Sequence, residues 1–155
     1  MNLTIIDMAV MRSSQIFCTF AERPISDYEL TIAQTLRGLL CAYNQKDAIA
    51  VTSYFTDDAR IDSLIGGGVV TRDQYKRVLE THYPHITSVR MDQINISLKN
   101  PRRIDTYGMF KIELRDGRHI GNLCLVRFAY IDEVWQIIGT QFVTREISHA
   151  SIDSR

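Results

Sequence analysis

The sequence after Pro84 consists of strand-like segments, and this run constrains the fold more than any other feature. Four segments follow one another, separated by the turn signals Asn100-Pro101, Asp116-Gly117 and Asp132-Glu133. They run from about Thr87 to Lys99, Arg102 to Leu114, Arg118 to Ile131 and Val134 to Glu146. We therefore predict an antiparallel meander for the second half of the chain.

The faces of these segments differ in polarity. In the second segment one parity is apolar, whereas Asp105, Tyr107, Lys111 and Glu113 share the other, and which face is concave stays open. In the third and fourth segments both parities are apolar, so both faces of the sheet must be covered. Helices can cover one face, and we expect a second copy of the chain to cover the other. The pattern thus predicts a homodimer through the face of the sheet that the helices leave uncovered.

Two capping boxes predict where helices begin. Ser26 with Glu29 opens the first helix, and Thr71 with Gln74 opens another, from about Arg72 to His82. The first helix then carries one apolar stripe. Its members are Ile32, Leu36, Leu39, Leu40 and Tyr43.

The stretch YNQKDAIAVTSYFTDDARIDS, residues 43–63, joins the first helix to the first strand. Asp47 is placed to cap a short helix from about Ala48 to Phe55. We expect Asp57 and Asp58 to end that helix, with a strand over residues 59–63. Asp57, Asp58 and Asp62 are predicted to be solvated turn and surface charges.

Composition limits the class of protein. With 155 residues we predict one domain, residues 25–146, preceded by an arm or short helix at 1–24 and followed by a polar tail at 147–155. Lys+Arg 18 balances Asp+Glu 18, so the basic footprint of a nucleic-acid binder is missing. Three cysteines lie far apart without metal-ligand spacing. We expect a cytoplasmic protein with no membrane span, no metal and no organic cofactor.

Three helices followed by a long meander, with DDARIDS entering the first strand and YIDEVWQIIG closing the last hairpin, resemble the nuclear transport factor two-like superfamily. Its relatives include ketosteroid isomerase, scytalone dehydratase and the SnoaL-like polyketide cyclases. The resemblance covers residues 26–145. It implies an α+β fold in which three N-terminal helices pack on a strongly curved antiparallel sheet, forming a cone-shaped half barrel with a mostly apolar pocket. In this superfamily the convex face commonly pairs with another subunit.

The resemblance to ketosteroid isomerase does not extend to its reacting groups. Ser63 stands where the base of that enzyme is expected, and Leu39 stands where its tyrosine is expected. The position of its second acid falls near Cys124 or Leu125. Since serine is not a base at neutral pH, the isomerase reaction is rejected.

The resemblance to scytalone dehydratase retains two positions. His85 matches a general acid/base histidine and Tyr43 matches a helix tyrosine, whereas Asn44 replaces an aspartate. Ser63 replaces a strand tyrosine, and a second histidine falls near Gly108. Histidine exchanges protons near neutral pH, so His85 is our candidate acid or base, assisted by Tyr43 or Asp105.

Two functions remain from the sequence. The first is a protein that binds a small, apolar organic ligand and carries out proton transfer of the lyase or isomerase type. Its predicted pocket lining includes Leu39, Ser63, Tyr107, Asn122 and Cys124. The second is a non-catalytic dimeric module for ligand binding or protein association, whose pocket is filled by its own side chains. Binding pockets usually exceed about 300 Å³, so a smaller cavity favours the second function.

Overall fold

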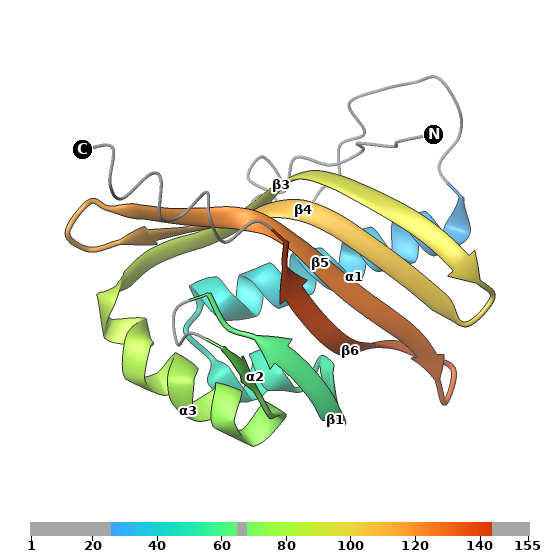
Figure 1. The fold of residues 1–155 in the computed structure, drawn as a ribbon, viewed down its shortest axis with the longest axis horizontal. Helices are drawn as coiled ribbons and strands as arrows, with labels where there is room; N and C mark the ends of the chain where they lie inside the picture. Colours follow the sequence, from blue (N-terminus) through green and yellow to red (C-terminus); the bar gives the residue numbers. More distant parts are fainter. Residues whose placement is uncertain (1–25, 65–67, 144–155) are drawn as a thin grey trace.

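The computed structural model describes residues 26–64 and 68–143 (Figure 1). The first half contains the helices α1 (Asp27–Asn44), α2 (Ala48–Thr52) and α3 (Arg72–His82), and the strands β1 (Phe55–Asp62) and β2 (Val69–Val70). A short 3-10 helix, Tyr83–His85, leads into the meander. The meander consists of β3 (Ile86–Asn100), β4 (Arg103–Leu114), β5 (His119–Ile131) and β6 (Val134–Phe142). The predicted arm 1–24 and tail 147–155 lie outside the described residues.

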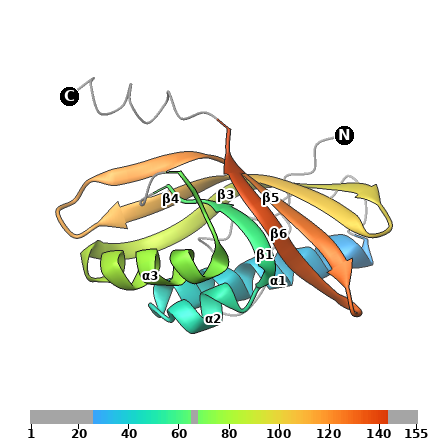
Figure 2. The ribbon, with the colours of Figure 1, turned by 60° about the horizontal axis from the view of Figure 1, so that its bottom comes forward.

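The six strands form one curved sheet in the order β2-β1-β6-β5-β4-β3. The neighbouring pairs are antiparallel except β1 and β6, which run parallel. In Figure 2 the sheet arches over α1, α2 and α3, which share its concave side. The predicted α+β fold, with helices packed on a curved, unclosed sheet, is confirmed. The parallel pairing of β1 with β6 departs from the predicted antiparallel sheet.

Both predicted capping boxes are present. The Glu29 carboxylate accepts hydrogen bonds from the backbone N–H and the hydroxyl of Ser26, both at 2.9 Å. At the start of α3, Gln74 accepts from the Thr71 N–H at 2.9 Å, and the Thr71 hydroxyl accepts from the Gln74 N–H at 3.2 Å. Each box satisfies backbone donors that a helix start leaves unpaired, which fixes the first residue of the helix.

The predicted end of the second helix is wrong. α2 ends at Thr52, and β1 begins at Phe55, within the segment predicted to be helical. The Tyr54 carbonyl accepts a hydrogen bond from the N–H of Ile137 in β6 at 2.9 Å, and Phe55 pairs with Ile137. Pairing with a strand distant in sequence thus overrides the local helical pattern. Asp57 and Asp58 are exposed residues of β1 and do not end the helix.

The core lies between the helices and the concave face of the sheet. In β4 the even-numbered residues face inward, and Ile104, Thr106 and Ile112 are buried there. Asp105 and Tyr107 therefore lie on the convex side, which settles the question that the sequence left open. Among the described residues, no helix is long and apolar enough to cross a membrane.

Candidate functional site

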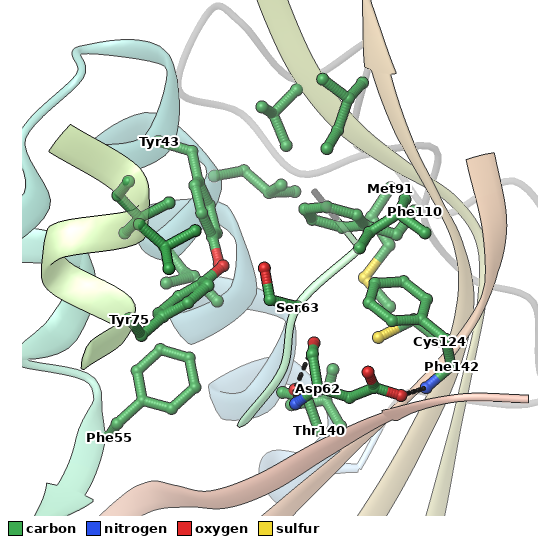
Figure 3. A pocket seen from close by; sticks show the side chains of 18 of the residues that line it. Tyr43, Phe55, Asp62, Ser63, Tyr75, Met91, Phe110, Cys124, Thr140 and Phe142 are labelled. Carbon is green, nitrogen blue, oxygen red and sulfur yellow. Dashed lines mark hydrogen bonds between the residues drawn. The ribbon is translucent and has the colours of Figure 1, made fainter. Parts of the chain in front are cut away.

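A cavity lies between α1, α3 and the concave face of the sheet (Figure 3). Its volume is about 40 Å³, enough for water-sized molecules and far below the ~300 Å³ of an ordinary ligand site. The helical lining is Leu36, Leu39, Leu40, Tyr43, Tyr75, Val78 and Leu79. The strands and the loop after β1 contribute Phe55, Asp62, Ser63, Leu64, Ile86, Val89, Met91, Phe110, Ile112, Cys124, Val126, Thr140 and Phe142. The lining is thus mostly apolar, with a few polar groups.

Two tyrosine hydroxyls meet at the helical side of the cavity. Tyr43 of α1 and Tyr75 of α3 form a hydrogen bond through their phenolic oxygens (Figure 3). Both side chains are buried, with 6% and 7% of their surface exposed. Burial is the main cause that raises the pKa of each phenol above its ordinary value. Both phenols therefore stay protonated at neutral pH, where they donate or accept hydrogen bonds and do not act as bases.

Aromatic rings pack around this hydroxyl pair. The ring of Phe110 meets Tyr43 edge-on at a centroid distance of 5.7 Å, and Phe55 meets Tyr75 at 5.8 Å. Phe142 continues the cluster, with its centroid 6.0 Å from that of Phe110. These rings occupy the part of the cone in which a ligand would otherwise lie, which accounts for the small cavity.

Asp62, at the end of β1, is the acidic residue of the cavity lining. Its Oδ2 accepts a hydrogen bond from the Phe142 N–H at 3.0 Å, and its backbone N–H donates to the Thr140 Oγ1 at 3.1 Å (Figure 3). The Thr140 hydroxyl in turn donates to the Asp62 carbonyl at 3.3 Å. Only 7% of Asp62 is exposed. The carboxylate thus holds β1 against β6.

Comparison with known proteins supports the fold. No protein-family model and no curated protein sequence matches the chain. Among solved structures, a protein of unknown function described as NTF-2 like, from Shewanella oneidensis, matches with a TM-score of 0.61 and 17% identity, over 71% of this chain and 93% of that one. A Nostoc punctiforme domain of unknown function with a cystatin-like fold matches with a TM-score of 0.63 and 16% identity, over 85% and 89% of the two chains.

A third match is a putative calcium/calmodulin dependent protein kinase II association domain from Xanthomonas campestris. Its TM-score is 0.63 at 13% identity, over 76% of this chain and 86% of that chain. The chain has the nuclear transport factor two-like fold. At these identities the matches show the fold alone.

Within the nuclear transport factor two-like fold, four predicted residues line the cavity. They are Leu39, Tyr43, Ser63 and Cys124. Burial raises the pKa of the Cys124 thiol to about 12, and the negative charge of Asp62 adds to this effect. Asn122 is completely buried on the same strand as Cys124, but it does not border the cavity. Asn122 therefore lies in the interior, as strand alternation with Cys124 predicts, but outside the cavity lining.

The other predicted residues lie elsewhere in the nuclear transport factor two-like fold. His85 is exposed at the end of the 3-10 helix, and its carbonyl accepts from the Arg115 N–H at 2.9 Å. Asp105 and Tyr107 are on the convex side of β4, across the sheet from the cavity. The structure therefore does not bring His85, Tyr43 and Asp105 together.

Asp62 and Tyr75 border the cavity but were not among the residues predicted for the site. The prediction that Asp62 is a solvated charge is wrong, because β1 ends at Asp62 and both Asp62 and Ser63 are buried there. Neighbouring side chains point to opposite faces of a sheet only within a strand, so this rule does not separate Asp62 from Ser63. Tyr75 lies on the buried side of α3, and nothing in the sequence signals its hydroxyl partner. Across residues 26–64 and 68–143 no three His, Cys, Asp or Glu side chains form a group able to hold a metal ion.

Proposed function

We propose that this chain is a non-catalytic, cytoplasmic association module, and that it assembles as a homodimer through the convex face of its sheet. The observation that carries the proposal is the small volume of the interior cavity, about 40 Å³. The chain's own aromatic side chains occupy most of the space inside the cone. A substrate of organic size requires several times that volume.

The placement of the ionisable groups supports a non-catalytic role. A proton-transfer site needs an acid or base within hydrogen-bonding reach of the substrate. Here His85 and Asp105 do not border the cavity, and the two cavity phenols are held protonated by burial. The Asp62 carboxylate accepts a hydrogen bond from a backbone N–H of β6, so it joins β1 to β6.

The convex face has the composition of an association surface. In register across β4 and β5, the half-buried Met109 pairs with the half-buried Leu123, and Tyr107 lies on the same face of β4. A polar rim lies beside this apolar centre, where Asp92 forms ion pairs at 3.1 Å with both Arg90 and Lys111. An apolar centre with a charged rim is typical of protein interfaces, and a two-fold axis lets one such face cover another. The Xanthomonas campestris structure of the same fold is itself described as an association domain.

Sedimentation equilibrium tests this proposal. We expect a dimeric mass at micromolar concentration, and a monomeric mass for Leu123→Asp, which places a charge at the centre of the face. Ile49→Asp is the matched control, since Ile49 is an exposed apolar residue of α2 on the helical side. A monomeric wild-type protein, or a Leu123→Asp variant that remains dimeric, contradicts the proposal.

The apolar lining with its hydroxyl pair favours one second candidate, the binding of a small apolar ligand in the interior. Such a ligand would have to displace Phe110 or Phe142 from the centre of the cone. Phe110→Ala enlarges the cavity, and titration with indole followed by fluorescence measures the outcome. Binding of indole by the wild-type protein as well as by the variant favours this candidate, and binding by the variant alone disfavours it.

A further inference from the structure

A second hollow lies on the convex side of the sheet, where β1, β6 and β5 run side by side. Its volume is about 490 Å³, within the range of small-molecule sites. Two arginines, Arg60 of β1 and Arg127 of β5, line it. We call this hollow the arginine groove.

The register of the sheet places a glycine between the two arginines. Arg60 pairs with Gly139 of β6, and Gly139 pairs in turn with Arg127. The two arginine Cα atoms are therefore about 10 Å apart, two strand spacings, with no side chain between them. A Cβ at position 139 would approach the Arg60 carbonyl oxygen to 3.2 Å. The bare backbone of Gly139 thus forms the floor of the arginine groove.

Neither arginine is neutralised by an ion pair within the described part of the chain. Arg72, Arg90 and Arg118, by contrast, each form an ion pair with an aspartate, at 2.5, 3.1 and 2.8 Å. Asp105 is the cross-strand neighbour of Arg127 in β4, yet the described residues show no ion pair between them. Both arginines that line the groove are exposed, and within the described residues their guanidinium donors have no ion-pair partner.

The remaining lining is suited to an anion attached to an apolar body. Gln141 adds an amide donor, and Leu125 and Ile138 form apolar walls. The acidic residue of the lining is Asp62, whose Oδ2 already accepts from the Phe142 N–H. Two arginines against one aspartate leave the groove with an excess of positive charge.

We propose that the arginine groove binds a small amphipathic anion, with a carboxylate or phosphate group between Arg60 and Arg127 and an apolar body against Leu125 and Ile138. Arginine forks recognise such groups through paired, charge-assisted hydrogen bonds. The chain carries no net charge, and two arginines are too few to follow a nucleic-acid backbone, so the ligand is a small molecule. The arginine groove lies on the β1 and β6 side of the same convex face that the association proposed above would use. It is argued from its own lining and not from that association.

Titration of the 155-residue chain with octanoate, octyl phosphate and octanol, followed by residue-resolved amide NMR, tests the proposal. We expect octanoate or octyl phosphate to shift the amides of Arg127, Gly139 and Gln141, and the tighter of the two identifies the preferred head group. Octanol carries the same chain without the charge and is expected to bind at least about tenfold more weakly.

Neutral substitutions provide the second arm of the test. Arg60→Gln and Arg127→Gln are each expected to weaken binding, and the double variant by about tenfold or more. Arg102→Gln, an exposed arginine in the turn before β4, is the matched control and is expected to bind like the wild type. Equal binding by the wild type and the double variant overturns the proposal. So does binding of octanol as tight as that of octanoate, or a set of shifts confined to the interior cavity.

Sedimentation of the same samples without ligand reports the association separately. A monomeric protein that binds octanoate at the arginine groove refutes the dimer and supports the groove. A dimer in which neither anion shifts the groove amides, with the same result for the monomeric Leu123→Asp variant, does the reverse.

Discussion

The side-chain amide of Asn44 pairs with both backbone polar atoms of Val89. Its Nδ2 donates to the Val89 carbonyl and its Oδ1 accepts from the Val89 N–H, both at 2.8 Å. The same Nδ2 donates to the Leu40 carbonyl in the last turn of α1 at 2.9 Å. Asn44 thus fastens the end of α1 to β3. An aspartate at this position offers no donor to the Val89 carbonyl, so asparagine is suited to a structural task here.

Asn44→Ala is therefore expected to lower the free energy of unfolding by about 2–3 kcal/mol, since it leaves both polar atoms of the buried Val89 without this partner. Urea unfolding followed by circular dichroism measures the change. Gln34→Ala, at an exposed position of the same helix, is the control and is expected to change stability by less than about 0.5 kcal/mol. Equal stability of the two variants would show that the Asn44 contact contributes nothing.

The Tyr43–Tyr75 hydroxyl pair predicts coupling between two substitutions. Tyr43→Phe or Tyr75→Phe alone removes one partner and leaves a buried hydroxyl, at an expected cost of about 1–2 kcal/mol. The double variant removes both hydroxyls and is expected to cost less than the sum of the two single changes. A double-mutant cycle from urea unfolding gives the coupling free energy, and strict additivity would argue against a hydrogen bond between the two rings.

Burial of the same phenols and of Cys124 predicts loss of stability in alkali. Burial raises the pKa of each group in the folded state above its unfolded value, and for Cys124 it raises the pKa to about 12. As pH rises, the unfolded chain therefore loses these protons before the folded chain does. Stability is thus fully present below about pH 9 and falls steadily above it. The urea midpoint, measured from neutral pH upward, reports this fall. A Tyr43→Phe/Tyr75→Phe double variant is expected to show a shallower decline, and an unchanged slope would count against the assignment.

The Asp62 carboxylate predicts a difference between two neighbouring acids of β1. Asp62→Ala removes the acceptor of the Phe142 N–H and is expected to lower the free energy of unfolding by about 2 kcal/mol or more. Asp58→Ala changes an exposed side chain of the same strand, with an expected effect below about 0.5 kcal/mol. Thermal unfolding of both variants tests whether Asp62 differs from a surface charge.

The sequence predicted the elements whose signals are local. Capping boxes fixed the starts of α1 and α3, and turn residues separated β3, β4, β5 and β6 close to their observed bounds. β1 was misplaced at its start, because Phe55 is held in the sheet by Ile137 and no residue near Phe55 signals that partner. Local patterns thus determine elements only where the partner is near in sequence.

The candidate site was harder to predict because it depends on which side chains converge. Leu39, Tyr43, Ser63 and Cys124, which the family resemblance singled out, border the cavity. His85 was chosen from a short resemblance, and the 3-10 turn presents it outward. Cavity size depends on how the aromatic rings of Tyr43, Phe110 and Phe142 pack together, which periodicity does not encode.

The parallel pairing of β1 with β6 has a consequence for the order of folding. The hydrogen bonds between Asp62 and Thr140 join positions 78 residues apart, whereas the hairpins of the meander join strands that follow one another. Closing a long loop costs more chain entropy and slows the search for the native pairing. We expect the meander and α1 to assemble first, and β1 to dock on β6 in the last and slowest step.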